Sequence, residues 1–331
     1  MSPIPTLVST SPRISASGLS KQFKIARSRS GSAMTIDAVL GVDVRIDPGE
    51  ILGVVGESGC GKSTLGRLLA GLMAPSSGLV DFGGVRLSDP GRIASGLKGR
   101  VQMVFQDPGR ALDPRMRIGA CIAEPLVGEP RAAQGEKVSE MLSLVGLPSD
   151  AQRRLPHELS GGEQQRACIA RALVAGADIV ILDEVVSALD PVLRNQILLL
   201  LDGLRSRLGT SYMFISHDLH AVNALSDRVA VMYLGQIVET VPVAAFAGGA
   251  LLHPYSVALR SSILRVERGK SQTAVALHGE VPSPGRRPRG CPFRTRCPIA
   301  ADVCAETNPP LLLAAPGHGI ACHFPGKATV A

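Results

Sequence analysis

A glycine-rich run between residues 56 and 64 combines one lysine with two neighbouring hydroxyl side chains. It reads Gly56, Glu57, Ser58, Gly59, Cys60, Gly61, Lys62, Ser63 and Thr64. Glycines allow the backbone to turn its N–H groups toward phosphate oxygens, Lys62 is long enough to reach β- and γ-phosphates, and the Ser63 hydroxyl suits Mg²⁺. The match at every fixed position makes a chance glycine-rich loop a poor alternative. The run therefore predicts that the chain binds ATP or GTP.

A second apolar run, residues 177–182, ends in the carboxylates of Asp183 and Glu184. Such an uninterrupted run is typical of a central parallel strand buried on both faces, and α/β sheets bind ligands at the carboxyl ends of such strands. Next to a phosphate loop, Asp183 would hold Mg²⁺ through its water shell. Glu184 would polarise the attacking water as general base.

Two elements must position these groups. Residues 51–55 before the glycine-rich run predict a short buried strand, and residues 65–72 after it predict a helix. This order of strand, loop and helix places the loop at a helix N-terminus, whose dipole favours anions.

A second candidate anion site, formed by Ser160, Gly161, Gly162 and Glu163, precedes a predicted helix over 167–174. Its hydroxyl and N–H groups can bind an anion. The chain already has one phosphate-binding loop, so a second anion site would have to bind a different nucleotide. Here the sequence resembles the ATP-binding subunits of ABC transporters, whose LSGGQ signature closes on the ATP held by the opposite subunit. Glu163 stands for the usual glutamine, a variant common in that family.

The resemblance assigns roles to four further residues, found in the family's order. Gln106 matches the Q-loop glutamine, which contacts Mg²⁺ or water and faces the membrane subunits. Asp190 matches the D-loop that crosses the dimer interface, and His217 matches the switch histidine that senses the γ-phosphate. Phe23 lies where the family places an aromatic against adenine, and a packing role is an equal alternative.

One position departs from the family pattern, because Val185 follows Glu184 where the family usually has proline. Proline restricts the residue before it, so its loss is expected to loosen the turn that aims Glu184. The signature and the switch histidine together exclude a GTPase or kinase built on the phosphate loop alone.

The composition and the distribution of charge exclude or disfavour several classes of protein. The chain has 331 residues, 45% of them hydrophobic, which excludes a wholly disordered chain. Aromatic residues make up 3% and tryptophan is absent, which disfavours a stacking surface for single-stranded nucleic acid. The net charge of +7 comes from the two ends of the sequence, so we expect no nucleic-acid partner. No apolar run is long enough to span a bilayer.

The resemblance implies an α/β fold: a P-loop, ABC-type nucleotide-binding domain with a RecA-like core, a β subdomain and a helical subdomain at about 107–172. We expect a flexible N-terminus at 1–13, the ATPase domain at 14–245, and an extension at 246–331 that holds a small loop-rich cysteine module. Proline and cysteine are concentrated in that extension.

The extension also indicates a branch of the family. His253, Pro254 and Tyr255, with the tail after them, resemble dipeptide/oligopeptide permease ATPases, most of all the dipeptide-permease subunit that pairs with a second, non-identical ATPase. The resemblance implies a heterodimer beneath two membrane permease subunits, fed indirectly by an extracytoplasmic solute-binding protein. The chain would lie peripherally on the cytoplasmic face of the inner membrane and drive import of dipeptides or oligopeptides.

Two other functions stay open. Relatives in the same family import nickel or another small solute. A soluble ABC-type ATPase acting on ribosomes or DNA is disfavoured, because the chain has one ATPase unit and no sustained heptads.

Four cysteines, Cys291, Cys297, Cys304 and Cys322, cluster near the end of the chain. Four thiolates can hold a [4Fe–4S] cluster or structural zinc, and the spacing lacks the CxxC pairs of a zinc ribbon. The resemblance implies the [4Fe–4S] cluster; zinc and four unligated thiols are the alternatives. His318 and His323 could substitute in a zinc site, but we expect them on the surface.

Overall fold

The computed structural model describes residues 13–25, 34–86, 99–261, 280–283, 285 and 287–327. The predicted flexible N-terminus lies, apart from Arg13, outside these ranges. The strands are β1 (Ile14–Ile25), β2 (Met34–Ile46), β3 (Ile51–Val55), β4 (Ser77–Phe82), β5 (Val85–Arg86), β6 (Val101–Val104), β7 (Ile179–Asp183), β8 (Ser211–Ile215), β9 (Arg228–Tyr233), β10 (Gln236–Pro242), β11 (Leu312–Ala315) and β12 (His318–Ile320). The α-helices are α1 (Lys62–Leu69), α2 (Pro108–Ala111), α3 (Ile118–Ala123), α4 (Arg131–Leu144), α5 (Gly161–Leu173), α6 (Pro191–Leu208), α7 (Leu219–Leu225), α8 (Val243–Gly248), α9 (Pro254–Ser261) and α10 (Asp302–Glu306).

An eight-stranded sheet, in the order β11-β12-β10-β9-β3-β8-β7-β6, forms the centre of the molecule. The strands from β9 to β6 run parallel. Every residue of β3, β7 and β8 is buried, as expected for parallel strands covered on both faces. The carboxyl ends of these three strands therefore meet at one edge of the sheet.

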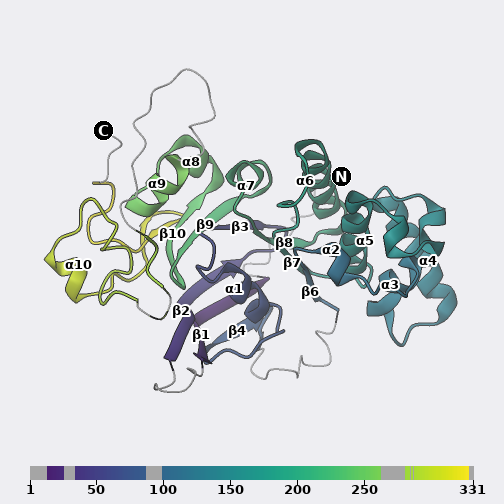
Figure 1. Cartoon of the computed structure of the whole chain (residues 1–331), viewed down its shortest axis with the longest axis horizontal. Coiled ribbons are helices and arrows are strands. Elements are labelled where there is room, and N and C mark those ends of the chain that lie inside the picture. The colour runs from purple at the N-terminus through teal and green to yellow at the C-terminus, as the bar shows by residue number, and fades with distance from the viewer. Residues whose placement is uncertain are drawn as a thin grey trace, which may run out of the picture.

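A smaller antiparallel sheet, β2-β1-β4-β5, faces this central sheet. Figure 1 shows α1 between the two sheets. Apolar side chains from both sheets and from α1 form one continuous core there, which includes Leu19, Val54, Leu65 and Met213. Because α1 is enclosed in this way, its N-terminus is held rigidly at the end of β3.

Helices α2 to α5 pack on one another beside β6, at the far side of the molecule from α10 (Figure 1). Their apolar side chains belong to a second hydrophobic core, which lies on the other face of the central sheet. Within the described ranges, no helix has the length and apolar character needed to cross a bilayer.

The described C-terminal segment, residues 287–327, is joined to the central sheet. β12 pairs with β10, and β11 adds the edge strand. The expected surface position of His318 is wrong: the residue is 9% exposed, and its Nε2 lies 2.7 Å from Oε1 of the fully buried Glu239. The prediction failed because His318 is buried only through the tertiary pairing of β12 with β10.

Candidate functional site

The phosphate loop adopts a backbone that only glycine fits at two points. Gly56 and Gly61 have φ angles of 151° and 108°. A Cβ on Gly56 would stand 2.1 Å from the Met232 carbonyl oxygen, and one on Gly61 would stand 2.1 Å from that of Ala38. The loop therefore curls tightly against β9 and β2 before α1 begins at Lys62.

The Lys62 side chain lies inside this curl. Its Nζ donates to the Gly56 carbonyl at 2.7 Å and to the Glu57 carbonyl at 3.1 Å. The residue is 5% exposed, so its ammonium is held in the loop rather than in solvent. Ser58 and Gly59 form the exposed tip of the loop, while Cys60 is buried and Thr64 half-buried.

The two predicted magnesium ligands meet across the sheet. Ser63 Oγ donates to Asp183 Oδ1 at 2.9 Å, although the residues are 120 positions apart. Burial raises the pKa of Asp183, while the Ser63 hydrogen bond lowers it. A hydroxyl and a carboxylate oxygen in contact are the donor set that suits Mg²⁺.

The turn after Asp183 keeps its shape without a proline. Glu184 has a φ of 52°, donates its N–H to the Ile215 carbonyl at 2.9 Å, and accepts the Ser187 N–H at 3.1 Å. Val185 and Val186 are buried. Burial of the two valines and this pair of backbone bonds fix the turn, so the looseness expected from the missing proline has no counterpart in the contacts.

Glu184 and His217 lie together at the end of β7 and β8. Glu184 Oε2 is 3.2 Å from His217 Nδ1, and Ser187 Oγ is 3.5 Å from the same nitrogen. The His217 side chain is 60% exposed and that of Glu184 20% exposed. A carboxylate with solvent access beside an imidazole can polarise a water.

Gln106 follows β6 at the same edge of the sheet and is exposed. Among the residues that the structure describes, its side chain has no hydrogen-bond partner, so it is not joined to Ser63 or Asp183. Phe23 on β1 is 37% exposed and lies under Lys21, whose Nζ is 5.5 Å from the ring centroid. Its ring is thus not packed into the core.

The second candidate anion site caps α5. Ser160 Oγ donates to Glu163 Oε2 at 2.7 Å, and the same carboxylate oxygen accepts the Ser160 N–H at 2.8 Å. Gly162 packs close to Leu193 of α6. No hydrogen bond or ion pair between described residues joins this site to the phosphate loop. Asp190, for its part, caps α6 by accepting the N–H groups of Val192 and Leu193.

Comparisons with known proteins agree with this geometry. The ABC transporter family matches residues 39–187, and the oligopeptide/dipeptide transporter C-terminal region matches residues 238–304. A putative peptide import ATP-binding protein of Brucella abortus is 46% identical over 92% of each chain. The chain belongs to the ABC transporter ATP-binding family. It is an ABC-type ATPase, for which ATP with Mg²⁺ is the expected ligand.

Other relatives of this ABC ATPase extend the likeness. The oligopeptide transport ATP-binding protein OppF of Escherichia coli is 45% identical over 87% of this chain and 88% of its own length. The dipeptide transport ATP-binding protein DppF of Haemophilus influenzae is 39% identical over 94% and 96%. Among solved structures, cbiO1 of Clostridium perfringens, part of an ABC transporter complex, matches with a TM-score of 0.62 at 25% identity, covering 77% of this chain and 96% of cbiO1.

Two residues at the ATP site of this ABC ATPase were not predicted. Tyr255 Oη accepts the Glu57 N–H at 2.9 Å, and Arg296 pairs with the Glu57 carboxylate. Tyr255 belongs to the His253, Pro254 and Tyr255 motif that indicated the peptide-permease branch of the family. Nothing in that motif indicated that its side chain reaches the phosphate loop. Arg296 is separated from Glu57 by 239 positions, so no local pattern could have found it.

The four C-terminal cysteines come into one region of the ATPase. Cys291 donates its N–H to the Cys304 carbonyl at 2.8 Å, and both residues are buried; Cys297 and Cys322 are half-buried. Burial, with a smaller contribution from the other three thiols, raises the pKa of Cys297 to about 11. Among the described residues, however, no three histidine, cysteine or acidic side chains are arranged to hold a metal ion. The four cysteines therefore share one region without forming a preformed metal site.

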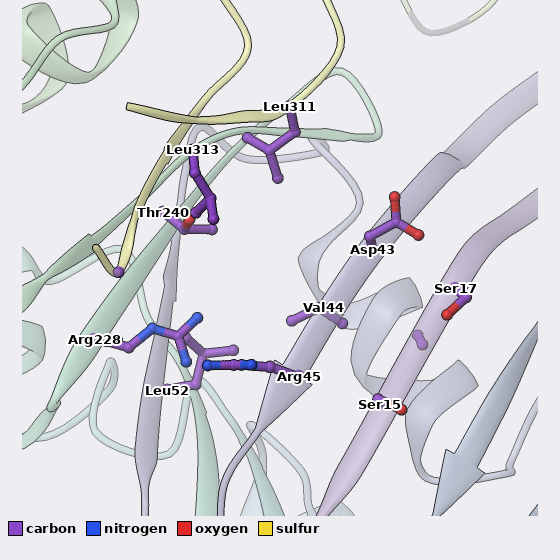
Figure 2. A pocket seen from close by; sticks show the side chains of 12 residues that line it. Ser15, Ser17, Asp43, Val44, Arg45, Leu52, Arg228, Thr240, Leu311 and Leu313 are labelled. Carbon is purple, nitrogen blue, oxygen red and sulfur yellow. The ribbon is translucent and has the colours of Figure 1, made fainter. Parts of the chain in front are cut away.

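A pocket away from the phosphate loop separates the β1–β2 sheet from the C-terminal hairpin of the ATPase. It has a volume of about 450 Å³. Figure 2 shows Arg45 and Arg228 directed toward one another above Leu52, with Leu311 and Leu313 on the opposite side. None of the predicted ATP-site residues lines it.

Proposed function

We propose that this ATPase is the motor subunit of an importer for dipeptides or oligopeptides, with MgATP bound at a dimer interface. The phosphate loop lies at the start of α1, between the two sheets, and the Ser160 signature lies at the start of α5, in the group of helices beside β6 (Figure 1). This separation within one chain supports the proposal. Each of the two sites offers half of a nucleotide cradle, so two subunits facing each other would complete two sites. ATP-driven closure would then bias the permease between two states, and hydrolysis would reset it.

Within that cycle the side chains have distinct roles. Ser63, Asp183 and Gln106 would hold Mg²⁺ and its water shell, and Glu184 would polarise the attacking water. Lys62 and backbone N–H groups within residues 56–64, other than that of Glu57, would bind the phosphates. His217 senses the γ-phosphate, Phe23 stacks on adenine, and Ser160 to Glu163 with Asp190 act across the interface. Residues 14–245 form the ATPase domain, with the helical subdomain at about 107–172, and residues 246–331 form the extension.

The permease contact is assigned to a groove of about 600 Å³ next to Phe105, the neighbour of Gln106. Its rim carries two conspicuously exposed apolar side chains, Leu72 at 57% and Val127 at 89%. A groove whose rim exposes apolar side chains, with the Glu124–Arg171 ion pair also in its lining, suits the end of a helix from a membrane subunit. The ATPase would thus be held peripherally on the cytoplasmic face of the inner membrane, paired with a second, non-identical ATPase.

A peptide solute is proposed because the relatives described above carry peptide, oligopeptide or dipeptide transport names. The test is uptake in vesicles that contain the full transporter and its solute-binding protein, with ATP supplied on the side of the ATPase. Labelled di- or oligopeptide should accumulate with ATP and not with Glu184→Gln present. Nickel uptake without peptide uptake would replace the peptide assignment, and turnover stimulated only by ribosomes or DNA would overturn the transport function.

For the four cysteines, the [4Fe–4S] proposal rests on donor chemistry and shared location alone. Chain purified without oxygen should contain iron and acid-labile sulfide, both lost in Cys291→Ser. Stoichiometric zinc without iron, or neither metal, would overturn the proposal.

A further inference from the structure

The side chain of Glu57, the second residue of the phosphate loop, is held by the C-terminal segment. Arg296 Nη1 donates to Glu57 Oε2 at 2.8 Å and Arg296 Nη2 donates to Oε1 at 3.1 Å. This fork on a carboxylate is the most directional ion pair that proteins make. The Arg296 side chain is 6% exposed, so solvent screens the pair weakly.

Contacts with a buried aromatic cluster orient the Arg296 guanidinium toward Glu57. It lies 5.9 Å from the centroid of the Tyr233 ring, and Nη1 is 3.5 Å from the Tyr233 hydroxyl. Tyr233 in turn packs against Phe293 and Tyr255, with ring centroids 5.3 Å and 4.7 Å apart. All three rings are buried. The cluster therefore fixes the position of Arg296 relative to β9.

The same cluster also holds the backbone of Glu57. The Tyr255 hydroxyl accepts the Glu57 N–H, while the Glu57 carbonyl accepts from Lys62 Nζ. One residue is thus fixed at its N–H, its carboxylate and its carbonyl. A shift of Glu57 would move the carbonyl that accepts from Lys62 Nζ. It would therefore also disturb Lys62, the residue expected to bind phosphate.

Electrostatics gives the pair a second effect. An unpaired Glu57 carboxylate would stand in the loop that receives the negative phosphates and would repel them. Arg296 neutralises that carboxylate, and its buried position makes the neutralisation strong.

From these contacts we propose that Arg296 is a positioning residue of the ATP site: the C-terminal segment sets the phosphate loop for ATP through the Arg296–Glu57 pair. The pair shapes the loop equally before and during hydrolysis. Its loss therefore weakens ATP binding and leaves the chemical step nearly intact.

The test measures the dissociation constant for MgATP of the full chain, and KM and kcat of the assembled transporter. Arg296→Gln is expected to raise Kd and KM about ten- to a hundredfold, with kcat changed less than about threefold. Glu57→Gln should change Kd less, because the amide oxygen can still accept one hydrogen bond from Arg296 and no unpaired carboxylate is left beside the phosphates. The double variant should bind ATP better than Arg296→Gln alone, a non-additive result that marks a direct interaction.

The control is Arg228→Gln, which breaks a comparable, largely buried pair with Glu50 away from the ATP site. It should lower the melting temperature and leave Kd unchanged. If Arg296→Gln does not fold, Arg296→Lys and Tyr255→Phe replace it, and each should raise Kd severalfold. The proposal is overturned if folded Arg296 variants melt earlier but bind ATP as the wild type does, or if the double variant is additive.

Discussion

His217 Nδ1 lies 3.2 Å from Glu184 Oε2, although the two residues belong to different segments of the chain. They meet because β7 and β8 are parallel neighbours, with Asp183 paired with Ile215. Glu184, the first residue after β7, and His217, the second residue after β8, are therefore placed side by side at the edge where Ser63 contacts Asp183.

This arrangement makes Glu184→Gln the direct test of the general base. The amide keeps the size of the side chain and cannot accept a proton, so steady-state hydrolysis should fall about 10²- to 10⁴-fold while ATP binding stays. Phosphate release and nucleotide binding by the assembled ATPase measure the two effects. Glu129→Gln, which removes a carboxylate paired with Lys137 on the helical side, is the control and should hydrolyse normally. Unaltered turnover in Glu184→Gln would remove Glu184 from this role.

The local elements of the site could be predicted from the sequence. The predicted strand at 51–55 matches β3, and the apolar run before Glu184 matches β7, because burial on both faces leaves an uninterrupted apolar signature. Helix α5 begins at Gly161, earlier than the predicted 167. Its start is set by the reciprocal bonds of Ser160 and Glu163, a pattern that the sequence already contained.

Contacts between distant segments could not be predicted. The Arg296–Glu57 pair, the Tyr255 bond to the phosphate loop, and the burial of His318 all depend on how the C-terminal segment docks on β9 and β10. A side chain's partner at such separation is decided by tertiary packing, and no periodicity or spacing in the sequence records it.

The bond between Ser160 and Glu163 leads to a second prediction. The Ser160 hydroxyl now donates to a carboxylate, which lowers the pKa of Glu163 and keeps a negative charge where the partner's phosphate would arrive. Glu163→Gln removes that charge and should strengthen ATP-driven association of the subunits about two- to fivefold, an energy of less than about 1 kcal/mol for an exposed charge. Sedimentation with Glu184→Gln present measures the association. Weaker association would show that Glu163 is needed to orient Ser160.

In the phosphate loop, Gly56 is closely packed and Gly59 is not, so the same substitution can be compared at the two positions. Gly56→Ala places a methyl group 2.1 Å from the Met232 carbonyl oxygen, so the loop must shift. We expect a loss of about 1–3 kcal/mol in unfolding free energy, together with loss of ATP binding. Gly59→Ala meets no atom within 4 Å and strains only its φ of 78°. It should cost about 1–2 kcal/mol and keep most of the ATP affinity. Equal ATP affinities in the two folded variants would contradict the steric explanation.

His253 makes the stability of the ATPase depend on pH. Its Nδ1 accepts the Tyr255 N–H at the start of α9, so the neutral ring carries its proton on Nε2, and burial lowers its pKa from 6.5 to about 3. The unfolded chain binds a proton below pH 6.5 and the folded chain does not. Stability from this group is therefore complete above pH 6.5 and falls by about 1.4 kcal/mol per pH unit as the pH drops toward 3.

The substitution His253→Asn tests this dependence. An asparagine side chain does not titrate in this range, and it can cap the start of a helix as the imidazole does. The variant should therefore have a flatter acid side of the unfolding profile than the wild type. Chemical denaturation at pH 7.5, 6.5 and 5.5 measures the difference in unfolding free energy between the two chains. Parallel profiles would mean that His253 is protonated in the folded protein.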